Sequence, residues 1–109
     1  MDELLRKKRD LAVYNVNESF VKEGKNPRLL LAYWPDVPFD EAFEAMSRDP
    51  QLSEEDRQAL QSAWGTLAQI VERADEEPLF GIVIVFFEGQ SAPGIVPIPA
   101  AAEDLIQLP

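Results

Sequence analysis

The chain has 109 residues, of which 46% are hydrophobic, and twenty acidic against ten basic side chains give it a net charge of −10. This length makes one ordinary domain, residues 1–109, and this hydrophobic content is typical of a globular protein. Because the sequence contains no cysteine and no histidine, it excludes disulfides, thiolate metal sites and catalysis by a thiol or an imidazole.

The charge is divided unevenly along the chain. Residues 1–30 hold seven basic and five acidic side chains, whereas the remainder holds three basic and fifteen acidic ones. Within the basic part, residues 2–10 predict one or two helical turns, with a mobile basic arm over residues 1–10 as the alternative. Residues 11–16 are apolar and fit either a strand or a continuation of that helix. Helix, strand and disorder therefore all stay open for residues 2–16.

The next stretch predicts a turn and a strand. Residues 23–27, Glu-Gly-Lys-Asn-Pro, have the composition of a turn. Residues 28–34, Arg-Leu-Leu-Leu-Ala-Tyr-Trp, then indicate a buried strand that ends before a proline.

Two amphipathic helices are predicted in the middle of the chain. Apolar side chains recur at helical spacing from residue 39 to residue 46, and a second helix is expected from about 54 to 74. Ser53 and Asp56 form a variant of the capping box at its start. The apolar stripe of the second helix includes Trp64, which is expected in the core. Gly65 is expected to allow close packing against a neighbouring backbone.

The C-terminal third predicts two strands and a short helix. Residues 80–87 are apolar on both alternating faces, which indicates a central strand covered on each side. Residues 95–99 contain two prolines and indicate an edge strand, because proline cannot donate to a ladder. Residues 100–108 are compatible with a final helical turn or two. The whole order predicts an α+β domain, with a small, mainly antiparallel sheet and two central amphipathic helices packed on one face.

No motif in the sequence points to catalysis. The serines stand in no nucleophile elbow, and the glycines never have the spacing of a phosphate-binding loop. Carboxylates are abundant and could bind Mg²⁺ or Ca²⁺, but their spacing matches no EF-hand loop. We therefore expect no enzyme, no catalytic residue, no metal site and no cofactor. A carboxylate-metal enzyme is the least favoured alternative.

The composition favours a non-enzymatic binding protein. An acidic surface without catalytic groups suits an inhibitor or regulator of a basic partner, of the immunity, antitoxin, anti-defence or DNA-mimic type. A small accessory subunit or assembly factor of a larger complex is the alternative. The expected contact residues are acids that begin the two helices and two aromatic residues at a strand end: Asp36, Asp40, Glu41, Glu44, Glu54, Glu55, Asp56, Tyr33 and Trp34.

The expected partner is itself a protein, either basic or nucleic-acid-binding. Direct binding to nucleic acid or to a membrane is not expected, and homo-oligomers stay open. With no cysteine and no apolar run longer than nine residues, the cytoplasm is the expected compartment.

Overall fold

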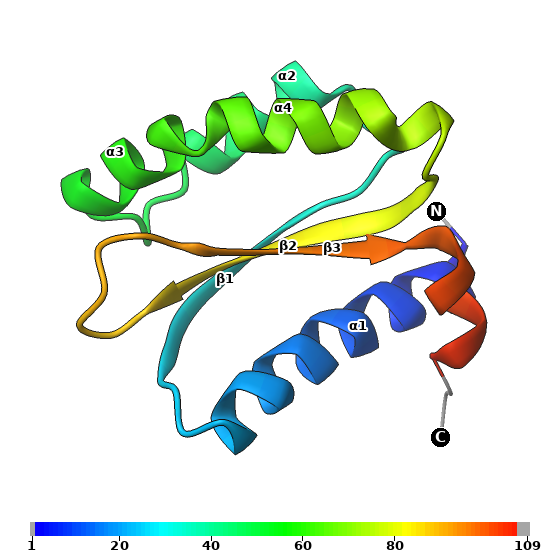
Figure 1. The fold of residues 1–109 in the computed structure, drawn as a ribbon, viewed down its shortest axis with the longest axis horizontal. Helices are drawn as coiled ribbons and strands as arrows, with labels where there is room; N and C mark the ends of the chain where they lie inside the picture. Colours follow the sequence, from blue (N-terminus) through cyan, green and yellow to red (C-terminus); the bar gives the residue numbers. More distant parts are fainter. Residues whose placement is uncertain (1, 107–109) are drawn as a thin grey trace.

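The computed structural model describes residues 2–106, and Figure 1 shows a sheet with helices on both of its faces. In chain order the elements are α1 (Glu3–Lys22), β1 (Pro27–Tyr33), α2 (Phe39–Ser47), α3 (Glu54–Ser62), α4 (Trp64–Glu72), η1 (Arg73–Asp75), β2 (Leu79–Phe87), β3 (Gly94–Pro99) and η2 (Ala100–Leu105), where η marks a 3-10 helix.

The sheet is antiparallel, with the strand order β1-β2-β3. All residues of β2 after Leu79 are buried, so the prediction of a central strand covered on both faces is confirmed. The prediction that β3 is an edge strand is also confirmed, and both of its prolines are exposed. An α+β fold with a small antiparallel sheet, as the sequence predicts, is therefore what the chain adopts.

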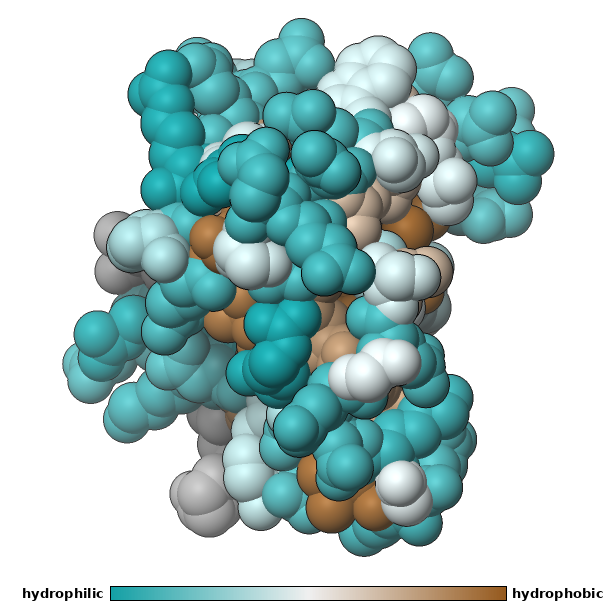
Figure 2. Space-filling model, turned by 90° about the vertical axis from the view of Figure 1, so that its left-hand side faces the viewer, coloured by the Kyte–Doolittle hydropathy of each residue, from teal (hydrophilic) through white to brown (hydrophobic). Residues whose placement is uncertain are grey.

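Alternate residues of β2 contribute to two separate cores. Ile82, Ile84 and Phe86 pack with buried side chains of the α2–α4 layer. Val83 and Val85, on the other face, pack against side chains of α1 such as Val16. Figure 1 shows the same division, with the α2–α4 layer on one face of the sheet and α1, accompanied by η2, on the other. In Figure 2, hydrophobic residues are visible at mid-height, level with the sheet, between more hydrophilic regions above and below.

The start of the chain is one long helix. Asp2 caps α1 by accepting a hydrogen bond from the Leu4 amide at 3.1 Å, and the helix continues to Lys22. Of the possibilities that the sequence leaves open, a strand at residues 11–16 is therefore wrong. The side chains of Val13, Val16 and Phe20 recur at helical spacing and cover β2, which gives this helix a buried face.

The predicted helix over 54–74 is two helices, α3 and α4, separated at Ala63 (φ −84°, ψ −5°). The predicted apolar stripe assumes one continuous helix. Because the interruption lies between Leu60 and Trp64, these two side chains do not share one helix face. Leu60 is fully buried, whereas Trp64 is 45% exposed, so the prediction of a core tryptophan is wrong. A Cβ atom added at Gly65 would also have no neighbouring atom within 4 Å, so close packing does not explain this glycine.

The end of the chain is a short 3-10 helix. The final helical turns expected over residues 100–108 are present as η2, which ends at Leu105. Residues 107 and 108 of that expected segment lie outside the described residues.

Candidate functional site

The sheet separates the charges of the molecule into two unlike layers. Residues 36–77, which we call the acidic layer, comprise α2, α3, α4 and their connections and carry twelve acidic against three basic side chains, a net charge of −9. Helices α1 and η2 lie on the opposite face and together carry five acidic against five basic side chains, a net charge of zero. The protein therefore presents a strongly negative surface on one side only.

Ion pairs neutralise only some of the carboxylates in the acidic layer. Glu44 pairs with Arg48, and Glu54 lies 3.3 Å from the Arg57 guanidinium. Other carboxylates of the layer are exposed and make no ion pair within residues 2–106; they are Asp40, Glu41, Glu55, Glu72, Asp75, Glu76 and Glu77. Because none of these seven forms an ion pair within residues 2–106, their carboxylates are accessible to a basic partner.

Asp36 lies at the boundary between the acidic layer and α1. Its Oδ1 accepts a hydrogen bond from Arg9 Nη2 at 3.0 Å, and its side chain remains about half exposed. Arg9 is only 7% exposed. This pair joins the loop after β1 to α1 and compensates the carboxylate, so Asp36 contributes less to the negative surface than Asp40 or Glu41 does.

The two aromatic residues predicted as partner contacts lie on opposite faces of the sheet. Tyr33 is 4% exposed and packs edge-to-face on Phe39, with 5.6 Å between ring centroids. Burial raises the pKa of its hydroxyl, and the nearby Asp36 charge raises it further. Tyr33 is a core residue and cannot contact a partner directly. Trp34 lies on the α1 face, away from the acidic layer.

Trp34 is held by a close approach to the central strand. A Cβ atom at position 81 would lie 2.4 Å from Trp34 Cε3, so only glycine leaves room for the indole ring. The Arg9 guanidinium carbon lies 5.0 Å from the centre of the same ring, within the range of a cation–π contact. Phe80 packs on its edge at 5.7 Å. These contacts give Trp34 a structural role.

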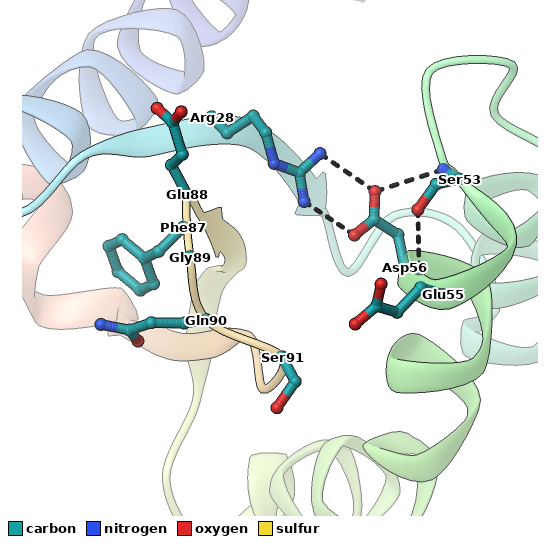
Figure 3. Close-up of a pocket in the computed structure, with 9 residues that line it drawn as sticks. All are labelled: Arg28, Ser53, Glu55, Asp56, Phe87, Glu88, Gly89, Gln90 and Ser91. Atoms are coloured by element: carbon teal, nitrogen blue, oxygen red, sulfur yellow. Dashed lines mark hydrogen bonds and ion pairs between the residues drawn. The ribbon is translucent and has the colours of Figure 1, made fainter.

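The remaining predicted residue, Asp56, is buried in a cleft at the start of α3 (Figure 3). Its two carboxylate oxygens accept hydrogen bonds from both terminal nitrogens of Arg28, at 2.7 and 3.0 Å. It also completes the predicted capping box with Ser53, in which each residue's amide donates to the other's side chain. These hydrogen bonds, that of Arg28 above all, hold the pKa of the Asp56 carboxyl below its usual range, against the opposing effect of burial.

The cleft around this pair has a volume of about 530 Å³ and lies between α3 and the segment that follows β2. Glu55 and Glu88 line it without an ion pair in the described part of the chain, while the charge of Asp56 is compensated by Arg28. Hydrogen bonding to Asp56 raises the pKa of the Arg28 guanidinium, with the charges of Asp56, Glu88 and Glu55 adding to this effect. The cleft is therefore an acidic indentation at the edge of the acidic layer.

Sequence reasoning missed several residues of this surface. Arg28 has no local signal, because its partner lies 28 positions further along the chain. The run from Glu72 to Glu77 is visible as an acidic helix end, and it forms a second uncompensated part of the layer. Trp64 is exposed beside Phe39, with ring centroids 6.4 Å apart.

Two features are absent from the part of the chain that the structure describes. Nowhere in residues 2–106 do three acidic side chains come together in a way that could hold a metal ion. None of the helices formed by these residues has the length and apolar character needed to cross a membrane. Comparison of the chain with protein-family models, with curated proteins and with solved structures gives no match.

Proposed function

We propose that this protein is a non-enzymatic binding protein that inhibits or regulates a basic protein partner through its acidic layer. The immunity, antitoxin, anti-defence and DNA-mimic proteins named above are the types of regulator that this covers. We also propose that it acts in the cytoplasm, since nothing in its composition calls for an oxidising compartment.

The single observation that carries this proposal is the separation of charge by the sheet. If acidity served only solubility, carboxylates spread over both faces would serve as well. Here the layer formed by residues 36–77 has a net charge of −9, while α1 and η2 on the other face together have a net charge of zero. A one-sided field of this kind orients a basic partner and accelerates its association.

The proposal is tested by affinity capture from a lysate of the source cell, at about 50 mM and about 500 mM salt, with mass spectrometry of the retained proteins. The Debye length falls from about 14 Å to about 4 Å between these conditions. We expect a basic or nucleic-acid-binding protein that is retained at low salt and released at high salt. Retention of no basic protein at low salt would contradict the proposal.

A second candidate function is an accessory subunit or assembly factor, and exposed apolar residues favour it. Leu4, Tyr14 and Val21 of α1 are each about half exposed, and Leu105 of η2 is 80% exposed. Helices α1 and η2 lie on the same face of the sheet, so a partner that docks on this face would cover these side chains. A partner that docks here would remain bound at about 500 mM salt, so the same capture experiment separates the two functions.

A further inference from the structure

We propose that the free edge of β1 receives an extended segment of the basic partner as a fourth strand of the sheet. This inference rests on the proposed function, because it specifies how the basic partner binds. In this binding mode, backbone hydrogen bonds of β1 provide the affinity, and the acidic side chains of α2 select a basic partner.

The outer edge of β1 is open. The sheet order places β2 on one side of β1, and none of residues 2–106 forms a strand on the other side. No other backbone hydrogen bond and no side-chain hydrogen bond reaches the main chain of residues 27–33 from the rest of the described chain. Alternate N–H and C=O groups of this strand therefore point outward without a protein partner, which is the arrangement that strand addition uses.

β1 also lacks the features that usually protect an edge strand. Proline or charged side chains on an edge, or a bulge, discourage pairing with another chain. In β1 these features occur only at its start, where Pro27 and Arg28 coincide with an irregularity in the register. The following residues, Leu-Leu-Leu-Ala-Tyr at 29–33, contain none of them. The opposite edge differs, because β3 carries Pro97 and Pro99 among its six residues.

The charges near the open edge indicate what kind of segment fits. Helix α2 packs over β1, through Phe39 against Tyr33, whereas α4 lies over β3, where Ile70 lines a hollow together with Pro97. The helix on the β1 side of the layer is therefore α2. It carries Asp40 and Glu41, both exposed and without an ion pair in residues 2–106.

An added strand would turn alternate side chains toward the two faces of the sheet. Side chains on the α2 face would lie near Asp40 and Glu41, so lysine or arginine suits these positions. Those on the other face would continue the apolar surface of Leu30 and its neighbours, which pack toward α1. The segment that fits best alternates basic and β-branched apolar residues.

The same charges disfavour a second copy of this chain at the edge. An antiparallel β1–β1 pair would place two α2 helices on the same face of the joined sheet. Each copy has a net charge of −10, and the exposed acids of α2 would repel one another. A basic segment is therefore the occupant to which this proposal commits.

The test uses a synthetic decapeptide of alternating lysine and valine as the probe, with the full chain at about 150 mM salt. Hydrogen exchange is followed by NMR at each backbone amide. We expect the peptide to slow exchange at outward amides of residues 28–33. Slowed exchange confined to other elements, or none at all, would overturn the proposal.

Two matched controls separate strand addition from general attraction to an acidic protein. A peptide with the same side chains, N-methylated on the edge that faces β1, keeps the charge but loses its donors. Because the N-methylated peptide cannot donate hydrogen bonds to the carbonyl groups of β1, we expect it to bind at least about tenfold more weakly. Equal affinity of the two peptides would overturn the proposal.

The second control compares two charge reversals of equal size. We expect Asp40→Lys combined with Glu41→Lys to weaken the lysine–valine peptide about tenfold. The matched variant, Glu76→Lys with Glu77→Lys, lies on the β3 side of the layer, where Glu77 lines the hollow with Pro97 and Pro99. This variant should lose much less affinity for the lysine–valine peptide. An equal loss of affinity in both variants would refute binding of the peptide next to α2.

Failure of this inference can be told apart from failure of the proposed function. A captured partner that leaves at high salt but does not protect the β1 amides would overturn strand addition and leave the proposed function standing. Absence of a basic partner at low salt would instead contradict the proposed function. The peptide measurement would still decide whether the edge of β1 accepts a strand.

Discussion

Replacing Asp56 by asparagine removes one charge and keeps nearly the same shape. Asp56 is 7% exposed and accepts hydrogen bonds from Arg28 and from the Ser53 amide. An asparagine side chain offers one acceptor oxygen in place of two, so one of the Arg28 hydrogen bonds is lost and the guanidinium loses its counterion. In Figure 3 this pair links β1 to the start of α3.

The expected cost follows from the exposure of the two partners. Hydrogen bonds to charged groups contribute about 1.5–3 kcal/mol, and Arg28 keeps a 40% exposed side chain, which favours the lower part of that range. We expect Asp56→Asn to lower the free energy of unfolding by about 2 kcal/mol at pH 7. For a domain of this size that corresponds to a fall in Tm of about 8 °C.

The effect should depend on pH in a defined direction. Since the pKa of Asp56 is lowered in the folded state, its contribution to stability is fully present above the ordinary carboxyl pKa of about 3.9. It is lost as the pH falls through the lower, folded-state pKa. The difference in stability between the wild type and Asp56→Asn should therefore be constant from pH 7 to pH 5 and shrink below pH 4.

Urea unfolding followed by circular dichroism, repeated between pH 7 and pH 2.5, measures this difference. Glu55→Gln is the matched control, because Glu55 is an exposed neighbour without an ion pair among residues 2–106. It should change the free energy of unfolding by less than about 0.5 kcal/mol. A cost for Asp56→Asn that equals that of the control, or one that does not shrink in acid, would refute the reasoning.

Four other substitutions test the packing. Val83→Asp should leave no folded protein, since it buries an unpaired charge at a fully buried position; a cooperative thermal melt of soluble variant would contradict this. Gly81→Ala should cost about 1–3 kcal/mol because its methyl group would meet the Trp34 ring, whereas Gly65→Ala, in open space within a helix, should stabilise by up to about 1 kcal/mol. The opposite order in urea unfolding would refute both. Trp64→Ala should cost less than about 1 kcal/mol because the side chain is 45% exposed, and a larger cost in the same assay would place it in the core.

The parts of the fold that the sequence predicts correctly have strong local signals. Residues 80–87 are apolar on both faces, and the strand they form is buried on both faces. Prolines mark β3 as an edge strand. Ser53 and Asp56 form the capping box that their spacing indicates.

Other parts depend on contacts that no local pattern reveals. Residues 11–16 fit both a strand and a helix, and their packing against β2 selects the helix. The break between α3 and α4 at Ala63 could not be predicted from a proline, because no proline lies at that position. Arg9 pairs with Asp36 and Arg28 pairs with Asp56, across 27 and 28 positions. Since ion pairs of that separation form only after the chain has folded, the acids that stay uncompensated could not be identified beforehand.

The most direct test of the acidic layer as the binding surface compares two variants that change the net charge equally. One reverses four acids of the layer to lysine, Asp40, Glu41, Glu72 and Glu76; the other reverses four acids on or next to α1, Glu3, Asp10, Glu18 and Glu23. Each carries a net charge of −2 in place of −10. The affinity of the captured partner is measured for both and for the wild type at about 100 mM salt. We expect the layer variant to lose about a hundredfold or more in affinity and the α1 variant to lose less than about tenfold. Equal losses would show that net charge alone matters and would contradict the assignment of the acidic layer as the binding surface.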